Sequence, residues 1–434
     1  MLEAKGSDLY AGGVAVAALV EKYSSPLYIY DAELVEERCR QLRSLLPDVD
    51  ILYSLKANPN PSIVAFLSDQ VFGADVSSLG ELQTALRAGF PRERICFVGP
   101  SKSAEELAAA IESDIGCVIA ESEEELRILD ELAGTAGVRA RVALRVNPAF
   151  DSRGSRLKMG GAPRQFGIDE ENVAPLIEER ARFKHLTIIG LHAYLGTRIL
   201  DWNVVFRNTE EILKMACQIA ERTCLELEFL DVGGGLGVPY FPGEHEFDLG
   251  QFAAAAGELF SHYRRLMPGT RFLMEMGRYL TADAGIYVAE VRYVKVSRGQ
   301  KYVLLSGGMN HHQATTSLGS LVKHHFPIVV ANKRDRPVTQ QAFICGPRCT
   351  PNDVLGKSVP LPDVASGDLI AVLKSGAYGF TASPLEFISH HWPGEVLAYK
   401  GSDYLVRDAA AVFSVVQSQP VVYVKEEALA TQSR

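Results

Sequence analysis

Short apolar segments alternate with amphipathic helical segments from about residue 51 to residue 276, and this rhythm constrains the fold most strongly. The segments that fit β-strands are residues 51–56, 71–76, 95–99, 117–121, 140–146, 187–194, 227–232 and 271–276. Helical patterns lie between them, among them residues 79–88, 104–112, 123–132 and 204–221. This alternation predicts a (β/α)8 barrel, with an open, doubly wound sheet as the structural alternative.

The pattern changes after about residue 280, where Gly and Pro are frequent and helical periodicity is scarce. Strand patterns cover residues 286–296, 302–305, 338–344, 369–373, 395–399 and 420–424. A further strand pattern at residues 26–30 is expected to join them. We therefore expect a barrel over residues 31–280, a mostly β domain made of residues 1–30 and 281–425, and a loose polar tail over residues 426–434.

Composition narrows the class of protein. Of the 434 residues, 47% are hydrophobic and 22% are charged, and the formal net charge is −9. No basic stretch of the kind that binds nucleic acid stands out. The seven cysteines include no C-x-x-C pair, and no apolar run approaches the length of a membrane span. The N-terminus lacks a signal-peptide pattern. These features predict a cytoplasmic protein with no nucleic-acid or membrane partner.

Polar residues and glycines stand at the carboxyl ends of the predicted strands, where barrels collect their chemistry. These positions are Lys56, Asp75, Gly99, Glu121, Arg145, His192, Asp231 and Glu275. Lys56 closes an apolar strand, so it either snorkels into water or serves as a desolvated amine that forms a Schiff base. The local sequence alone leaves both open.

Two later motifs suit a phosphorylated ring cofactor. Gly233, Gly234 and Gly235 follow the predicted seventh strand, a common phosphate site in barrels, although a plain flexible turn is the alternative. Glu275 could hold a protonated ring nitrogen and Arg278 could bind an anion, or the two could form an ordinary ion pair.

Three further residues have both a structural and a functional interpretation. His192 is either a hydrogen-bonded strand-end residue or a stacking partner for a ring. Cys349, on a loop held by Gly-Pro and Thr-Pro, is either an inert thiol or a proton donor. Tyr378 lies in a Gly-rich turn and is either a packing aromatic or a site residue. The paired histidines lack metal-site spacing, so we expect no metal.

Taken in order, these motifs resemble the fold-type III pyridoxal-phosphate decarboxylases of the ornithine/diaminopimelate decarboxylase family, from about Pro26 to Leu397. The resemblance implies that Lys56 is the Schiff-base lysine, that Cys349 is catalytic and that His192 stacks on the ring. It also implies a homodimer in which Cys349 and Tyr378 reach the active site of the partner subunit. The remaining implied cofactor-binding residues are Asp75, Thr197, Gly233, Gly234, Gly235, Glu275, Gly277, Arg278 and Tyr378.

Departures from the family pattern bear on the substrate. Diaminopimelate decarboxylases usually have C-E-S where this chain has Cys349-Thr350, and they have an Arg-Pro shortly after D-A-G-M-N where this chain has His311 and His312. The glutamate and the arginine that would bind the distal amino group and the distal carboxylate of diaminopimelate are therefore both missing here. Residues 158–161, 165–167, 307–312 and 349–353 instead resemble a branch that contains a butirosin-pathway glutamyl-acyl-carrier-protein decarboxylase and exosortase-associated decarboxylases.

The resemblance therefore implies α-decarboxylation of an amino acid with an extended or conjugated side chain, in a secondary-metabolite or related biosynthetic pathway. An aminoacyl group on an acyl carrier protein is a candidate substrate. Thr350, Asp353, His311 and His312 are the candidate substrate residues. Alternatives are a decarboxylase of diaminopimelate or another free diamino acid, another fold-type III activity such as racemisation, and a non-catalytic decarboxylase-like regulator.

Overall fold

The structure is a computed structural model that describes residues 3–150, 157–158, 160–161, 163–316, 325–409, 417–418 and 420. The predicted strand at 420–424 and the predicted loose tail at 426–434 lie, apart from residue 420, outside the described residues, as does Met159 of the segment 158–161. Among the described helices, none combines the length and the apolar character needed to cross a bilayer.

Eight parallel strands close into a barrel. They are β5 (Val49–Ser54), β6 (Gly73–Val76), β7 (Ile95–Phe97), β8 (Cys117–Ala120), β9 (Ala140–Asn147), β12 (Leu186–His192), β14 (Phe229–Gly234) and β15 (Arg271–Met276). Each strand pairs with the next in this order, and β15 pairs with β5. The pairing of β15 with β5 confirms the predicted (β/α)8 barrel and excludes the open sheet.

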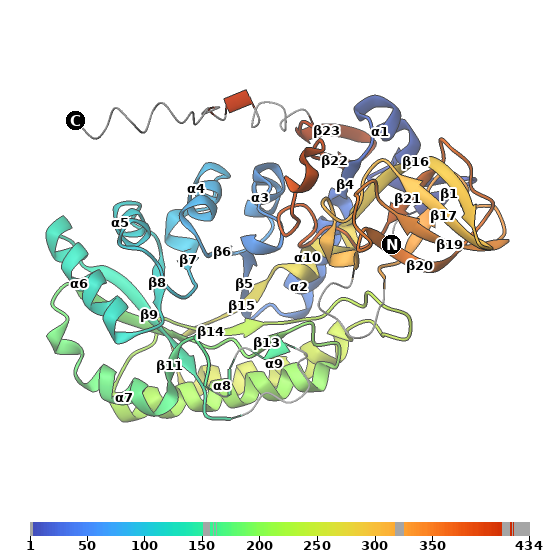
Figure 1. Cartoon of the computed structure of the whole chain (residues 1–434). Coiled ribbons are helices and arrows are strands. Elements are labelled where there is room, and N and C mark those ends of the chain that lie inside the picture. The colour runs from blue at the N-terminus through green and yellow to red at the C-terminus, as the bar shows by residue number, and fades with distance from the viewer. Residues whose placement is uncertain are drawn as a thin grey trace, which may run out of the picture.

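Helices surround this barrel (Figure 1). They are α2 (Ala32–Leu45), α3 (Pro61–Ser68), α4 (Leu79–Arg87), α5 (Ala104–Glu112), α6 (Glu123–Ala136), α7 (Glu170–Glu178), α8 (Trp202–Thr223), α9 (Leu249–Leu266) and the short α10 (Arg278–Thr281). Three of these helices, α4, α5 and α6, are capped at the N-terminus by a serine. The hydroxyl oxygens of Ser78, Ser103 and Ser122 each accept a hydrogen bond from a backbone N–H of the first turn. Such caps fix where each βα loop ends, and these loops form the rim of the barrel.

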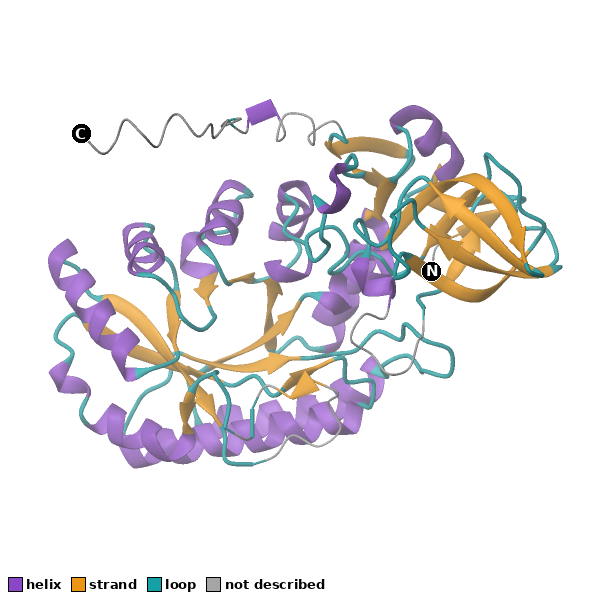
Figure 2. Ribbon diagram, in the orientation of Figure 1, coloured by secondary structure: helices purple, strands orange, loops and turns teal. Residues whose placement is uncertain are grey.

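The remaining strands form a second group with few helices (Figure 2). Its main sheet contains β4 (Leu27–Asp31), β16 (Gly285–Ser297), β17 (Gln300–Leu305), β18 (Ile328–Val330), β19 (Gln340–Cys345), β20 (Val354–Leu361), β21 (Leu369–Val372), β22 (Gly394–Tyr399) and β23 (Ser402–Arg407). We call it the β domain. Strand β4 pairs with β16 and β22, so the predicted strand at 26–30 does join it. The exact domain boundaries stay a prediction.

Smaller elements complete the described chain. They are β1 (Glu3–Lys5), β2 (Asp8–Ala11), β3 (Val14–Ala15), α1 (Val16–Tyr23), β10 (Leu157–Lys158), β11 (Ile168–Asp169) and β13 (Gly196–Thr197).

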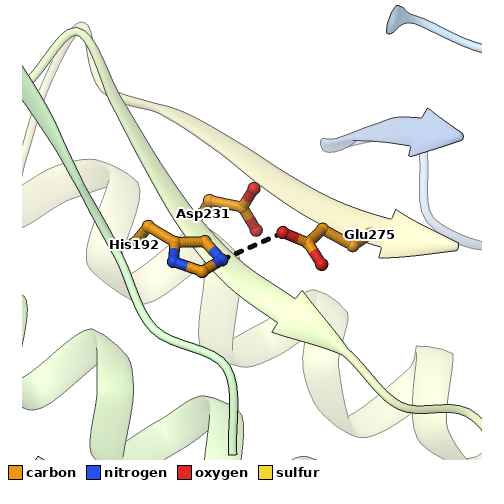
Figure 3. Close-up of side chains that lie close together, drawn as sticks. All are labelled: His192, Asp231 and Glu275. Carbon is orange, nitrogen blue, oxygen red and sulfur yellow. Dashed lines mark hydrogen bonds and ion pairs between the residues drawn. The ribbon is translucent and has the colours of Figure 1, made fainter. Parts of the chain in front are cut away.

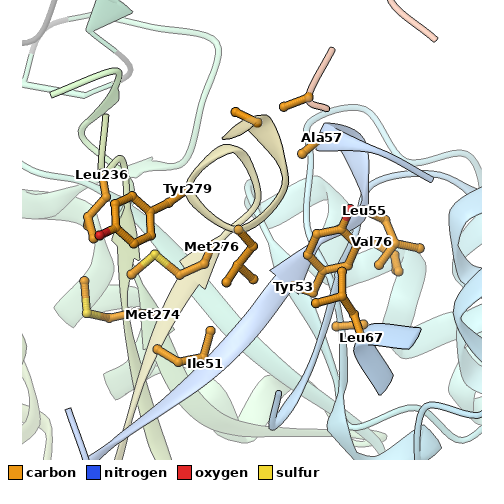
Figure 4. Packing of buried hydrophobic residues seen from close by; sticks show 14 of the residues in the cluster. Ile51, Tyr53, Leu55, Ala57, Leu67, Val76, Leu236, Met274, Met276 and Tyr279 are labelled. Atoms are coloured by element: carbon orange, nitrogen blue, oxygen red, sulfur yellow. The ribbon is translucent and has the colours of Figure 1, made fainter. Parts of the chain in front are cut away.

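One hydrophobic core lies under the first and last barrel strands (Figure 4). Ile51 and Tyr53 of β5 and Met274 and Met276 of β15 are all buried in it. The Tyr53 hydroxyl donates a hydrogen bond of 2.7 Å to the carbonyl oxygen of Asn58. This contact closes the turn that follows β5, and the core therefore fixes the position of the residue in the middle of that turn, Lys56.

Candidate functional site

Lys56 lies in a 3-10 turn, Leu55–Ala57 (η1), directly after β5. Its Nζ atom is 3.2 Å from Asp75 Oδ2 and 3.9 Å from Glu275 Oε2, and its side chain is 40% exposed. Burial works against the ammonium charge, but the two carboxylates outweigh it and raise the pKa of Lys56 well above its ordinary value. The lysine is therefore held at the rim by charge, and does not snorkel away from the protein.

Three buried groups meet beside it (Figure 3). His192 ends β12, Asp231 lies in β14 and Glu275 lies in β15, and their ligating atoms lie within 4.8 Å of one another. His192 Nε2 is 2.9 Å from Glu275 Oε1. Burial would raise the pKa of Glu275, but Lys56 and the hydrogen bond to His192 bring it down to about 2. Glu275 is thus a permanently ionised carboxylate.

Asp231 behaves in the opposite way. Burial and the neighbouring Glu275 charge raise the pKa of Asp231 to about 7. Its Oδ1 atom accepts a hydrogen bond of 2.8 Å from the Gly233 N–H. Such a His/Asp/Glu group has donors that metals use, but the Lys56 ammonium already neutralises Glu275 and would repel a divalent cation. The absence of a metal stays a prediction.

Glycines form a tight cradle at the end of β14. Gly233 and Gly235 have φ angles of 69° and 92°, which favour glycine. A Cβ atom on Gly234 would lie 1.8 Å from the Glu275 carbonyl oxygen, and one on Gly235 would lie 2.2 Å from that of Gly196. Only bare backbone fits here, as a loop that surrounds a phosphate with N–H groups requires.

Arg278 and Tyr378 lie next to this cradle. The Arg278 Nη1 atom donates a hydrogen bond of 3.0 Å to the Tyr240 hydroxyl, and its guanidinium lies 4.5 Å from the centre of the Tyr378 ring. The Tyr378 N–H donates to the Ala57 carbonyl oxygen at 2.8 Å. Tyr378 therefore reaches the site within its own chain, and the expectation that the partner subunit supplies it is wrong.

Gly277 explains why β15 can approach the lysine turn. A Cβ atom there would lie 2.8 Å from the Cβ of Ala57. One cavity connects these features. It is lined by Ser54, Lys56, Tyr194, Thr197, Gly235, Leu236, Glu275, Met276, Gly277, Arg278, Tyr279 and Tyr378.

The site has the donors and acceptors that pyridoxal phosphate needs. Lys56 offers an amine, Glu275 a carboxylate for the ring nitrogen, and the glycine cradle with Arg278 a place for the phosphate. Several buried polar atoms around it have no hydrogen-bond partner among the described residues: Asp75 Oδ1, His192 Nδ1, Asp231 Oδ2 and Arg278 Nε. Unpaired buried polar atoms are costly, so a polar ligand that pairs with them fits this site.

The candidate substrate residues lie elsewhere. Cys349 and Thr350 stand between β19 and β20; Cys349 is exposed and is not among the described residues that line the cavity. Asp353 is buried, and its two oxygens accept the N–H groups of Met309 and Arg348, each at 2.7 Å. Asp353 thus ties two loops together, a structural role that the sequence analysis did not foresee.

His311 and His312 are buried as well. His311 lies 3.2 Å from the Tyr287 hydroxyl, and His312 lies 2.9 Å from Ser375 Oγ. Burial lowers the pKa of each histidine to about 3, so both are neutral. The structure does not bring them to the Lys56 cavity, and a direct substrate contact gains no support from their positions.

Sequence reasoning missed two aromatic residues of the site. Tyr194 faces the Lys56 ammonium, which lies 5.7 Å from its ring centre, and Tyr240 accepts the hydrogen bond from Arg278. Tyr194 stands two residues after His192, and this spacing was a usable signal. Tyr240 lies in a loop beyond β14 and had none.

Comparison with known proteins agrees with this geometry. The family model described as "Pyridoxal-dependent decarboxylase, pyridoxal binding domain" matches residues 32–282. An L-glutamyl-[BtrI acyl-carrier protein] decarboxylase from Niallia circulans is 39% identical over 93% of this chain and 96% of its own. A diaminopimelate decarboxylase from Aquifex aeolicus is 32% identical over 94% of each chain.

A solved structure extends the match to the whole fold. The diaminopimelate decarboxylase from M. jannaschii in complex with L-lysine superposes with a TM-score of 0.88 at 25% identity, covering 97% of this chain and 98% of its own. Together with the family model over residues 32–282, these relatives show that the chain belongs to the pyridoxal-dependent decarboxylases and is a carboxy-lyase that uses pyridoxal phosphate.

Proposed function

We propose that this decarboxylase removes the α-carboxyl group of an amino acid whose side chain is extended or conjugated, foremost an aminoacyl group on an acyl carrier protein. The observation that carries the proposal is Thr350, which follows Cys349 where a diaminopimelate decarboxylase usually has a glutamate. The 39% identity to a decarboxylase of a carrier-bound glutamyl group supports it.

The local contacts of Thr350 agree with this proposal. Its Oγ1 atom accepts the Asn352 N–H at 3.4 Å, and its carbonyl oxygen accepts the Asp353 N–H at 3.2 Å. The residue thus builds a tight turn and offers no carboxylate to a distal ammonium group. A free diamino acid would lose the ion pair between its distal ammonium group and a carboxylate at this position, whereas a conjugated side chain does not need that ion pair.

The proposed roles of the site residues follow from their charges. Lys56 supplies the amine that holds the cofactor. Glu275, whose pKa is about 2, stays ionised and keeps a proton on the ring nitrogen. Pyridoxal phosphate, when bound, would supply an electron sink for the pair that the departing carboxyl group leaves behind. Cys349 then delivers a proton to the α-carbon.

The position of Cys349 favours action from a second copy of the chain. This residue is exposed and lies outside the cavity that contains Lys56. We therefore infer a homodimer in which each subunit lends Cys349 to the other's site, whereas Tyr378 serves its own.

Release of CO2 from a panel of substrates tests the substrate class. The panel compares free lysine, ornithine, diaminopimelate and glutamate with glutamyl and lysyl thioesters on a phosphopantetheine carrier. We expect turnover of a thioester to exceed that of every free amino acid. The alternative function is that of a diaminopimelate decarboxylase, and the 32% identity to such an enzyme supports this alternative. Activity confined to free diaminopimelate would establish that alternative and overturn the argument from Thr350.

A further inference from the structure

Arg348 is a buried arginine whose guanidinium makes no hydrogen bond to the described residues. It lies in the loop between β19 and β20, it is 6% exposed, and this lack of a hydrogen-bond partner applies to Nε, Nη1 and Nη2 alike. Arg145, which is 5% exposed, shows the usual solution, an ion pair of 2.8 Å with Glu121. A buried guanidinium that makes no hydrogen bond is costly, so Arg348 is a candidate to pair with a ligand.

Burial lowers the pKa of Arg348, and the neighbouring Asp353 carboxylate opposes this shift through its charge but makes no hydrogen bond to the guanidinium. Both oxygens of Asp353 accept backbone N–H groups, those of Met309 and of Arg348 itself. The Tyr287 hydroxyl is engaged with His311. The other charged or titratable neighbours are cationic or basic, since Arg292 lowers the pKa of Arg348 and Arg348 lowers that of His390. The surroundings therefore hold excess positive charge.

A second unpartnered polar group lies on the adjoining loop. Asn310 is fully buried, and both atoms of its amide lack a partner. Its loop is locked to the Arg348 loop through Asp353, because a Cβ atom on Gly308 or on Gly346 would lie within 2.2 or 2.3 Å of the Asp353 carboxylate. Two rigidly joined loops thus each carry a buried polar side chain with unused hydrogen-bonding capacity, and one of them also carries Cys349.

We propose that Arg348 recognises an oxyanion on the part of the substrate that is remote from the reacting α-carbon. This anion is either a carboxylate on the extended side chain or the phosphate of a phosphopantetheine arm. The proposal rests on the proposed function, because the adjacent Cys349 brings Arg348 within one residue of the reacting centre of the other subunit. A guanidinium pairs with either oxyanion through two parallel hydrogen bonds.

Binding requires the side chain to turn outward, since its nitrogens are covered in the single chain. This movement breaks no hydrogen bond, because Arg348 makes none through its side chain. An anion is favoured over a neutral partner because it compensates the guanidinium charge as well as filling its hydrogen-bonding capacity.

Kinetics of Arg348→Met test the proposal on the enzyme loaded with pyridoxal phosphate. The substrates are glutamyl thioesters of pantetheine and of 4′-phosphopantetheine, together with free 2-aminoadipate and norleucine. The two pairs are the phosphopantetheine and pantetheine thioesters, and 2-aminoadipate and norleucine, with the anionic substrate named first. We expect KM to rise about 30-fold or more for the anionic substrate of one pair, with kcat nearly unchanged. The KM of the neutral substrate of that pair should not change. A rise with phosphopantetheine alone identifies a phosphate, and one with 2-aminoadipate alone a carboxylate. Equal losses for charged and neutral substrates would overturn the proposal.

Arg141→Met is the matched control. Arg141 is an exposed arginine near the start of β9, at the other end of the barrel strands from Lys56, and it pairs with Glu228 at 2.6 Å. It should leave every KM in the panel unchanged. If no thioester is turned over at all, the carrier-bound substrate fails, but the comparison of 2-aminoadipate with norleucine still tests Arg348.

Thermal unfolding separates recognition from a structural role. For a recognition residue, Arg348→Met removes a buried charge that makes no hydrogen bond and should not lower Tm, and inorganic phosphate should raise the Tm of the wild-type holoenzyme more than that of the variant. A lowered Tm with the same response to phosphate would mark Arg348 as structural and refute the proposal. Should Arg348→Met fail to fold, Arg348→Lys, which keeps the charge without the paired donors, should show a smaller rise of KM for the same anionic substrate.

Discussion

Two carboxylates one strand apart have pKa values that move in opposite directions. Glu275 lies 3.9 Å from the Lys56 ammonium and hydrogen-bonds His192, and its pKa falls to about 2. Asp231 is equally buried, but the Glu275 charge lies beside it and its own pKa rises to about 7. One residue is thus fixed as an anion while the other can take up a proton. The permanent negative charge is therefore that of Glu275, the residue proposed to hold the ring nitrogen of the cofactor.

The opposed shifts predict how stability changes with pH. Asp231 has a folded pKa of about 7 against 3.8 when unfolded, so its stabilising proton is fully bound below pH 3.8 and is lost as pH rises through 7. Glu275, lowered from 4.5 to about 2, contributes stability above pH 4.5 and loses it only near pH 2. Between pH 5 and pH 8 the contribution of Asp231 to stability therefore falls as pH rises, whereas that of the buried His311 and His312, whose pKa values fall from 6.5 to about 3, rises up to about pH 6.5.

Asp231→Asn should remove the Asp231 contribution and leave that of the two histidines, because the amide oxygen still accepts the Gly233 N–H but cannot titrate. Urea unfolding without added cofactor, at pH 5 and pH 8, measures it. We expect the variant to gain stability relative to the wild type on going to pH 8. A difference between the two proteins that is the same at both pH values would contradict the assignment to Asp231.

At the scale of elements, the barrel strands could be predicted and much of the β domain could not. Each barrel strand is a short apolar run followed by an amphipathic helix, so its signal is local. Strands β18, β20 and β23 were missed, since β20 contains Gly356 and Pro360 and each strand is defined by pairing with distant segments. The position of Tyr378 could not be predicted for the same reason, because it depends on a hydrogen bond to Ala57, which is distant in the sequence. No sequence pattern indicates that the Arg348 side chain makes no hydrogen bond to the described residues.

The glycine cradle gives a prediction at this scale. Gly234→Ala would push a methyl group against the Glu275 carbonyl oxygen, so the strands must separate, at a cost of about 1–3 kcal/mol in unfolding free energy and with loss of cofactor affinity. Gly257→Ala, in the interior of α9, is the control, because no atom lies within 4 Å of its Cβ. It should gain up to about 1 kcal/mol. Calorimetry measures the unfolding free energy of both variants, and titration with pyridoxal phosphate measures their cofactor affinity. If the two variants gave the same values, the cradle would tolerate a side chain and the prediction would be wrong.

At the scale of the whole molecule, the cavity that contains Lys56 does not have Cys349 among its described lining residues. The barrel of one subunit holds Lys56, Glu275 and the glycine cradle, and its own β domain adds Tyr378. Cys349 lies on the surface outside this cavity. A single described chain therefore contains the binding machinery without the proposed proton donor, and a second copy that presents its Cys349 loop would complete the site.

Mixing two inactive variants tests this arrangement. Lys56→Ala and Cys349→Ala each disable both sites of their own homodimer, but a mixed dimer has one site with both Lys56 and Cys349 intact. Random exchange of subunits makes half of the dimers mixed, so activity should return to about 25% of the wild-type value. Lys56→Ala mixed with Glu275→Gln is the control, because both changes lie in the same barrel. If Cys349 instead acted within its own chain, a mixed dimer would have no intact site, and the first mixture would stay as inactive as its two parents.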